Sequence, residues 1–261
     1  MLAYDGMSDI GLNKELQEDI IYHVEYGKNI HLFVITDGVG TVNEQMNPAA
    51  IACSEVSDYI KRVYEYDEDV LKENAEFILQ MALYSANRVL GTFHLVNDEQ
   101  YNGFGTSMTA CLTYDKKFSF AHCGNTRLHL IKVNKGGQPI INQLTLDHTE
   151  GFEKLARKEI TEELYLTGLE KLKLTSALGV FSDPDIQTST SRFEKNNIIV
   201  MTTDGIHYPL WQASILELVL KAENTSSACK ALIDAAKIMQ YPDNMSAMVI
   251  YSLPEETATP D

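Results

Sequence analysis

The chain has 261 residues, of which 44% are hydrophobic and 9% aromatic, and its formal net charge is −16 at pH 7. This apolar content suits one packed domain, or at most two small ones, and it excludes global disorder. Because an acidic surface repels phosphate backbones and anionic lipids, we expect neither nucleic acid nor a membrane surface as the primary partner.

The start of the chain, MLAYDGMSDI, lacks the basic and apolar segments of a signal peptide. No apolar stretch approaches the roughly 20 residues that are needed to span a bilayer. The cysteines form no Cys-x-x-Cys pair, so we expect reduced, mostly buried thiols rather than zinc ligands or disulfides. They are Cys53, Cys111, Cys123 and Cys229. These features together predict a cytoplasmic protein.

The first part of the chain predicts a strand followed by two helices. Residues 31–36 form a short apolar run that ends on an Asp-Gly pair, as expected for a buried strand. The Asn-Pro pair at 47–48 provides an N-cap and a proline at the first helical position. A second helix is predicted from about residue 68 to residue 89, where Gly91 closes it.

The remainder of the chain alternates between short strands and helices. The middle predicts an antiparallel meander of strands at 106–114, 117–123, 127–133 and 139–144. Residues 149–174 are charged and mostly helical in pattern, so we interpret them as an exposed insert. The last part predicts a strand at 198–203, helices near 209–221 and 225–239, and a strand at 246–252. We expect one domain over residues 1–253, with helices covering the sheets, and a mobile tail at 254–261.

Four acidic residues stand where predicted strands begin or end. Asp37 and Asp204 follow apolar strands and precede glycine, Asp243 precedes the last strand, and Asp19 heads the segment that we expect to be the first strand. Strand ends meet at sheet edges, where the repulsion between acids must be relieved by shifted pKa values or by bound cations. Oxygen ligands suit Mg²⁺ or Mn²⁺ better than zinc. Each acid alone could equally form a turn or a cap, so the residues predict only a candidate metal site.

Eight segments, taken in chain order, resemble the motifs of the metal-dependent protein phosphatases of type 2C, especially the compact bacterial serine/threonine phosphatases. They are SDIG (8–11) with QED (17–19), VITDGVG (34–40), GTSMTACL (105–112), CGNTR (123–127), LTLDHT (144–149), LTSALG (174–179), VMTTDGI (200–206) and PDNMSAMVI (242–250). Each motif is weak alone, but eight in the order of the family are specific and cover nearly the whole chain.

The resemblance implies an α+β fold, a four-layer α-β-β-α sandwich in which pairs of helices flank a central antiparallel β-sandwich. It implies two Mn²⁺ or Mg²⁺ ions in a cleft at one end, with Asp37 bridging both ions. The Gly38 carbonyl would hold one ion, and Asp204 and Asp243 the other. Two ions lower the pKa of a water between them, which then attacks phosphorus in line. The implied activity is hydrolysis of phosphoserine and phosphothreonine on a protein.

Other roles follow from the same resemblance. Asp19 would act through metal-bound water, with Glu18 beside it, and residues 149–174 would be the flap that recognises the substrate. Lys14 stands where the family has a phosphate-binding arginine. Lysine keeps the positive charge but cannot donate two parallel hydrogen bonds, so we expect it to bind phosphate more weakly than arginine does. Lys14 could also be an ordinary exposed lysine. The implied partner is a phosphorylated protein, a kinase or its target, and a monomer is expected.

Further departures from the family pattern lower the expected activity. Val39 and Thr41 stand where bacterial members have Met and Gly in the sequence Asp-Gly-Met-Gly-Gly. Asn125 stands where bacterial members have an aspartate that binds a third, weaker metal. A neutral amide adds no charge, so this third site is expected to be weak or absent, although asparagine also suits the turn. The alternatives are a catalytically silent module that binds a phosphoprotein or partner, and a phosphatase dedicated to one signalling protein.

Overall fold

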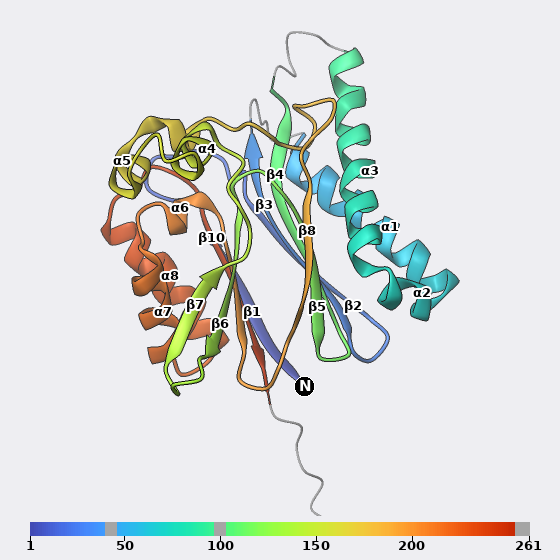
Figure 1. Ribbon diagram of the computed structural model, residues 1–261. Helices are drawn as coiled ribbons and strands as arrows, with labels where there is room; N and C mark the ends of the chain where they lie inside the picture. The colour runs from blue at the N-terminus through green and yellow to red at the C-terminus, as the bar shows by residue number, and fades with distance from the viewer. Residues whose placement is uncertain (40–45, 97–102, 254–261) are drawn as a thin grey trace, which may run out of the picture.

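The computed structural model describes residues 1–39, 46–96 and 103–253, and its architecture is a sandwich of four layers (Figure 1). Two antiparallel five-stranded sheets lie face to face in the middle. Helices cover the outer face of each sheet. The α+β fold with a central β-sandwich between helices, expected from the resemblance, is therefore confirmed.

Each sheet combines strands from distant parts of the chain. The first contains, in spatial order, β1 (Leu2–Asp9), β10 (Met245–Ser252), β9 (Ile198–Thr202), β6 (Arg127–Val133) and β7 (Pro139–Gln143). The second contains β2 (Ile20–Tyr26), β3 (Ile30–Val39), β4 (Gly105–Tyr114), β5 (Lys117–Cys123) and β8 (Gln187–Arg192). Because β3 and β9 lie in different sheets, the two strands that lead to Asp-Gly pairs face each other across the sandwich.

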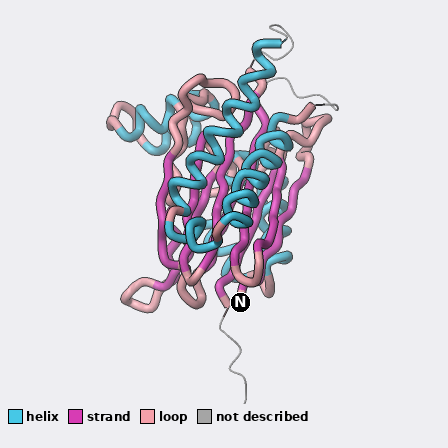
Figure 2. The backbone as a smooth tube through the Cα atoms, turned by 90° about the vertical axis from the view of Figure 1, so that its right-hand side faces the viewer, coloured by secondary structure: helices cyan, strands magenta, loops and turns pink. Residues whose placement is uncertain are grey.

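The helical layers are α1 (Pro48–Tyr66), α2 (Glu68–Glu73) and α3 (Ala75–Val96) on the second sheet, and α7 (Gln212–Lys221) and α8 (Thr225–Ile238) on the first. Figure 2 shows the long helices lying side by side in front of the strands. The Asn47 side chain accepts hydrogen bonds from the backbone N–H groups of Ala49 and Ala50, so the predicted helix start is confirmed. No helix in the described part of the chain is long and apolar enough to cross a membrane.

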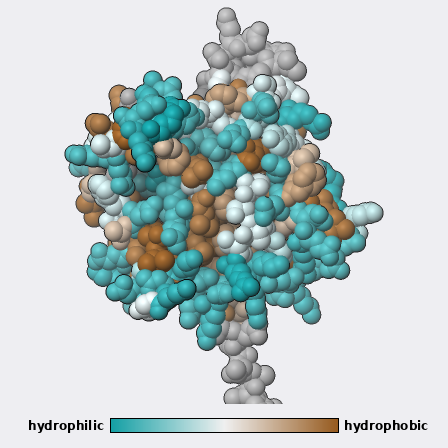
Figure 3. Space-filling model, in the orientation of Figure 1, coloured by the Kyte–Doolittle hydropathy of each residue, from teal (hydrophilic) through white to brown (hydrophobic). Residues whose placement is uncertain are grey.

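Three hydrophobic layers hold the sandwich together. Alternating residues of β3, β4 and β5 point into the space between the sheets, where Phe33, Cys111 and Phe120 are buried, and the intervening residues contact α1 and α3. All four cysteines are buried and unpaired, as predicted. The outer surface is mostly hydrophilic on the face that Figure 3 shows, in keeping with the charge of the chain.

Two details of the predicted elements are wrong. The single helix over 68–89 is two helices, because the backbone at Asn74 leaves the helical region with φ −118° and ψ 24°. Gly91 does not end the second one. The helix α3 continues to Val96, since Leu90 beside it is fully buried and packing outweighs the low helix propensity of glycine.

Two edge strands were not predicted from the sequence. The strand β8 has the polar sequence QTSTSR and shows no apolar run. The strand β1 is half-buried along its length and pairs with β10 over eight residues. Asp19 therefore precedes the second strand of the chain and not the first. The tail at 254–261 and Thr41 lie outside the described residues.

Candidate active site

The four acids that the sequence singled out converge at one end of the sandwich. Asp37 lies in β3 of one sheet, and Asp19 precedes β2 beside it. Asp204 is the first residue of the short helix α6 (Asp204–His207), which follows β9 of the other sheet, and Asp243 precedes β10. The pKa of Asp37 is raised well above its usual value, first by burial and then by the charges of the other three acids. The acids therefore share one electrostatic environment.

The second Asp-Gly pair has a steric reason. A Cβ atom at Gly205 would lie 1.9 Å from the backbone oxygen of Asn244. Only glycine lets the start of α6 approach the segment that carries Asp243 this closely. The pair at 204–205 therefore brings one carboxylate beside another, and it is not a surface turn.

Burial makes the charges of these acids costly. Asp19 and Asp204 are 3% and 7% exposed. Burial, followed by the charge of Asp243, raises the pKa of Asp204 to about 8, and burial raises that of Asp19 to about 7 although hydrogen bonds from Thr203 and Ser246 oppose the shift. Bound cations would relieve this cost, and an oxygen-only donor set suits Mg²⁺ or Mn²⁺.

No group of three or more His, Cys, Asp or Glu side chains within the described ranges is assembled into a ready metal-binding cluster. The acids are instead engaged by neighbouring donors. The hydroxyl of Thr203 donates to Asp19 over 2.8 Å, and the amide of Asn125 donates to Asp204 over 3.2 Å. The donor chemistry thus fits divalent cations, and each of these contacts uses only one oxygen of its carboxylate.

Lys14 contacts two acidic side chains at this end of the sandwich. Its ammonium lies 2.6 Å from Glu18 and 2.9 Å from Asp243. Burial alone would lower the pKa of Lys14, but the hydrogen bonds to these two acids raise it. Lys14 therefore places a permanent positive charge at the edge of the acidic cluster. Its predicted contact with phosphate stays a prediction.

Asn244, which sequence reasoning did not single out, orders the N-terminal acids. It is 2% exposed, and its side-chain oxygen accepts a hydrogen bond of 2.7 Å from the backbone N–H of Glu18. Its amide nitrogen donates to the carbonyls of Ile10 and Leu16 over 2.8 and 3.1 Å. Asn244 directly follows Asp243 in the motif PDNMSAMVI, and this position is the sequence signal that could have identified it.

Asn125 uses both ends of its amide within the site. Its oxygen accepts a hydrogen bond of 2.8 Å from Ser107, and its nitrogen donates to Asp204. The oxygen that could have bound a cation is thus already engaged. This arrangement supports the expectation of a weak third metal site, which stays a prediction.

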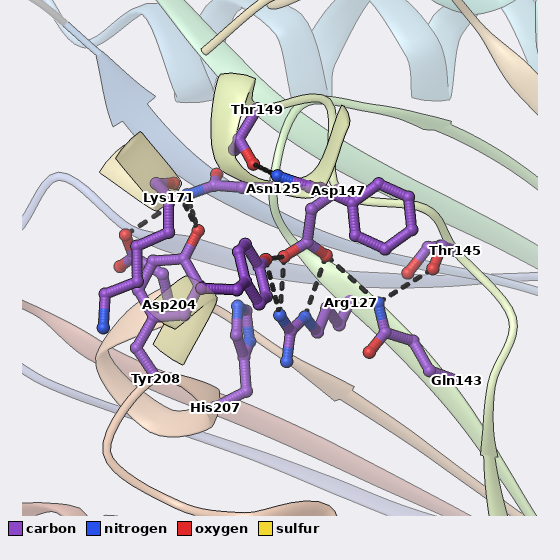
Figure 4. Close-up of polar contacts among 12 residues, drawn as sticks. Asn125, Arg127, Gln143, Thr145, Asp147, Thr149, Lys171, Asp204, His207 and Tyr208 are labelled. Carbon is purple, nitrogen blue, oxygen red and sulfur yellow. Dashed lines mark hydrogen bonds and ion pairs between the residues drawn. The ribbon is translucent and has the colours of Figure 1, made fainter. Parts of the chain in front are cut away.

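The LTLDHT segment anchors the flap through a buried ion pair (Figure 4). The Arg127 guanidinium makes two parallel hydrogen bonds, of 2.8 and 2.6 Å, to the carboxylate of Asp147. Tyr165 of the helix α5 (Glu162–Thr167) donates its hydroxyl proton to the same carboxylate and accepts a hydrogen bond of 3.2 Å from Arg127. The flap is therefore attached to the sheet by a charged network that is shielded from water.

A second anchor brings a flap lysine toward the acids. The hydroxyl of Tyr208 donates a hydrogen bond of 2.8 Å to the backbone oxygen of Lys171, in the 3-10 helix η1 (Leu169–Leu172). The Lys171 ammonium lies 4.9 Å from the centre of the Tyr208 ring. Burial lowers the pKa of Lys171, and the charge of Asp204 opposes this shift. Sequence reasoning missed both residues, because their roles depend on contacts between distant segments.

The insert at 149–174 is helical, as predicted. It consists of α4 (Glu150–Ala156), α5 and η1, and it lies at the acidic end of the sandwich (Figure 1).

The hydroxyl of Thr106 donates a hydrogen bond of 2.8 Å to the backbone oxygen of Asp37 at the end of β3. Val39, the last residue of β3, pairs with Gly105 and offers no polar group to the site.

Comparison with known proteins places these features in a family. The serine/threonine phosphatase stp of Listeria monocytogenes is 22% identical over 243 residues, which is 93% of each chain. The protein phosphatase PhpP of Streptococcus pneumoniae is 21% identical over 252 residues, 97% of this chain and 98% of that one.

Solved structures show the same fold. The serine/threonine phosphatase Stp1 from Staphylococcus aureus matches with a TM-score of 0.83 at 21% identity, over 97% of this chain and 96% of its own. The catalytic domain of PstP, in complex with two manganese ions, matches with a TM-score of 0.76 at 21% identity, over 97% of this chain and 99% of its own. PstP thus holds the kind of ion pair that the resemblance implies for this chain.

The family model of protein phosphatase 2C matches residues 11–238. This range includes Lys14, Asp37, Asn125, the flap and Asp204. The chain therefore belongs to the protein phosphatase 2C family, whose members are metal-dependent serine/threonine protein phosphatases.

Proposed function

We propose that this chain removes phosphate from serine or threonine of a protein by using Asp37, Asp204 and Asp243 to hold two Mn²⁺ or Mg²⁺ ions, with the Gly38 carbonyl as a further ligand. When bound, such ions supply a water of lowered pKa and neutralise phosphoryl charge. The observation that carries the proposal is the meeting of four acids from both sheets at one end of the sandwich, with raised pKa values at three of them.

The remaining residues position the reactants. Asp19 and Glu18 would hold metal-bound water, Lys14 would attract the phosphate, and the flap would contact the protein around the phosphorylated residue. Lys171 adds a second positive charge on the flap side of the cleft, where the charge of Asp204 acts on it. The phosphate of the substrate would thus lie between the ammonium groups of Lys14 in the core and Lys171 in the flap.

The expected partner is a phosphorylated protein, either a kinase or its target. We propose a monomer of one domain over residues 1–253 that acts in the cytoplasm, since its four cysteines are unpaired and buried. The acidic charge of −16 would disfavour substrates with acidic surroundings and nucleic acids alike.

The test is hydrolysis of a small aryl phosphate with Mn²⁺, with and without chelator, by the parent and by Asp204→Asn. We expect chelation to abolish the activity and the substitution to reduce kcat by about 100-fold or more. Asp234→Asn is the matched control, because Asp234 lies on α8 and pairs with Lys230 on the surface. Activity that survives both chelation and Asp204→Asn would exclude the two-metal mechanism.

Two observations favour a second candidate, a silent module that binds a phosphoprotein. Lys14 is held by two acids of the site, and Asn125 leaves Asp204 without an acidic neighbour at that position. Calorimetry with Mn²⁺ separates the two functions, because a module that has lost the site would bind no metal at micromolar concentration. An active chain would bind about two ions, and Asp204→Asn would weaken their binding.

A further inference from the structure

A cavity of about 780 Å³ opens between the sheets at the end opposite the acids. It is lined from both sheets, by His31 at the start of β3 and by Leu2 of β1 among others. Asp37 lies six positions after His31 along β3, which places the cavity about 20 Å from the four acids. The two sites therefore do not overlap.

The inner end of the cavity is polar. Thr113 is 2% exposed and lines it, and its hydroxyl has no hydrogen-bond partner among the described residues. Its cross-strand neighbour His31 is also buried and shares a hydrogen bond of 3.2 Å with His23. Burial lowers the pKa of His31, so the ring is neutral at pH 7. A buried hydroxyl without a partner is costly, so a polar ligand group that reached it would relieve this cost.

The middle of the cavity is apolar. Leu2 and Leu253 line it on the first sheet, and Phe193 lines it after β8 of the second. Phe193 is fixed by a hydrogen bond of 2.8 Å from its backbone N–H to the carbonyl of Lys116. A ligand body that contacts these side chains must itself be apolar or flat.

The mouth of the cavity is basic, which is unusual in a chain with a net charge of −16. Four basic side chains and two acidic ones line it: Lys116, Lys117, Arg192 and Lys195, with Asp115 and Glu194. Arg192 pairs with Glu194 over 3.5 Å, and Asp115 lies 3.6 Å from Lys72. The mouth thus keeps a positive excess, and clustered lysines are well suited to phosphate.

We propose that this cavity binds a nucleoside phosphate. Its base would lie between the sheets with a polar edge on Thr113, and its phosphates would contact the basic mouth. A fatty acid would leave the Thr113 hydroxyl without a partner, and inorganic phosphate would fill neither the depth nor the apolar middle. The volume of about 780 Å³ lies within the range of roughly 300–1,000 Å³ that is usual for small-molecule sites.

The test is calorimetry of the Mn²⁺-loaded full chain with the four common nucleoside 5′-diphosphates, beside the nucleosides and inorganic phosphate. We expect at least one diphosphate to bind with a Kd on the order of 0.1 mM. Thr113→Val should weaken this binding by about fivefold without lowering the thermal midpoint, since it removes only an unpartnered hydroxyl. The double variant Lys117→Gln/Lys195→Gln should weaken it by about tenfold.

Controls separate this cavity from the metal cleft. Lys221→Gln/Lys230→Gln removes two exposed lysines of α7 and α8 and should leave the binding unchanged. The proposal is overturned if no diphosphate binds below about 1 mM, or if inorganic phosphate binds as tightly. It is also overturned if Asp204→Asn abolishes the binding while the Thr113 and lysine variants do not, because the nucleotide would then occupy the metal cleft.

Discussion

Lys14 is the residue whose role the structure changes most. Its ammonium contacts both Glu18 and Asp243, and in the proposed mechanism it attracts the phosphate. Because arginine could offer two parallel donors, we expect Lys14→Arg to lower KM for a phosphopeptide by about threefold. Lys14→Met should raise KM by about tenfold through loss of the charge, with a smaller effect on kcat.

Steady-state kinetics on one phosphopeptide measures both changes. Lys28→Met serves as the control, because Lys28 lies in the turn between β2 and β3, at the other end of the sandwich. An unchanged KM in Lys14→Met would show that Lys14 only balances the charge of the two acids.

Asn125 gives a second prediction at this scale. Asn125→Asp would remove the donor to Asp204 and place a carboxylate beside it. We expect the bound manganese to rise from about two to about three ions per chain, and the metal-free protein to become less stable through repulsion. Metal analysis after gel filtration and thermal unfolding with chelator check the two effects. Asn224→Asp, an exposed helix cap, should alter neither. A stoichiometry that stays at two would show that the charge of this residue does not decide the third site.

The candidate site could be predicted from single residues only in part. Asp37, Asp204 and Asp243 stand at strand ends, so local pattern and chain order were enough to select them. Lys171 and Tyr208 carry no such signal, because each matters through a hydrogen bond between the flap and α6. Contacts of this kind depend on the tertiary fold and leave no periodicity in the sequence.

The flap is an element whose position depends on a few buried contacts. Tyr165→Phe would remove one hydroxyl that joins α5 to Asp147 and Arg127. We expect the free energy of unfolding to fall by about 1–2 kcal/mol. Backbone hydrogen exchange across residues 162–172 should also become faster, because this anchor holds the flap on the sheet.

Hydrogen-exchange mass spectrometry of the parent and the variant measures this directly. Tyr66→Phe is the control, since the Tyr66 side chain is 85% exposed. Exchange that remains as slow in Tyr165→Phe as in the parent would show that other contacts hold the flap.

Predictability also differs between elements. Strands such as β3 and β9 are buried on both faces, so their continuous apolar runs revealed them. The edge strand β8 consists of polar residues and is held by its ladder with β5, which no local pattern encodes. The break at Asn74 and the continuation through Gly91 were missed because packing against the sheet, and not propensity, sets helix ends here.

At the scale of the whole molecule, the sandwich separates two chemical environments. The acidic end collects carboxylates from both sheets, and the opposite end collects lysines and arginine around a cavity. The strand β3 runs between them and contributes His31 to one and Asp37 to the other. The fold thus presents an anion-binding surface that the overall charge of −16 does not reveal.

The response of the whole fold to acid depends on the Arg127–Asp147 pair. Burial alone would raise the pKa of Asp147, but the charge of Arg127 and the hydrogen bonds from Arg127 and Tyr165 hold it below its usual value of 3.8. A lowered carboxyl pKa stabilises the fold above the pKa of the unfolded chain, and this stability is lost as the pH falls through the folded value. The pair should therefore support the fold at neutral pH, and its contribution should decline progressively as the pH falls below about 4.

Asp147→Asn tests this prediction by leaving Arg127 buried without its partner. We expect the free energy of unfolding at pH 7 to fall by about 3–5 kcal/mol. Between roughly pH 5 and pH 3, where carboxylates take up protons, the variant should lose less stability than the parent, because one of the titrating groups is absent. Urea unfolding across this range measures both curves, and Asp58→Asn on the exposed side of α1 provides the control. Parallel curves for parent and Asp147→Asn would contradict the assignment, since the pH dependence would then arise from other carboxylates.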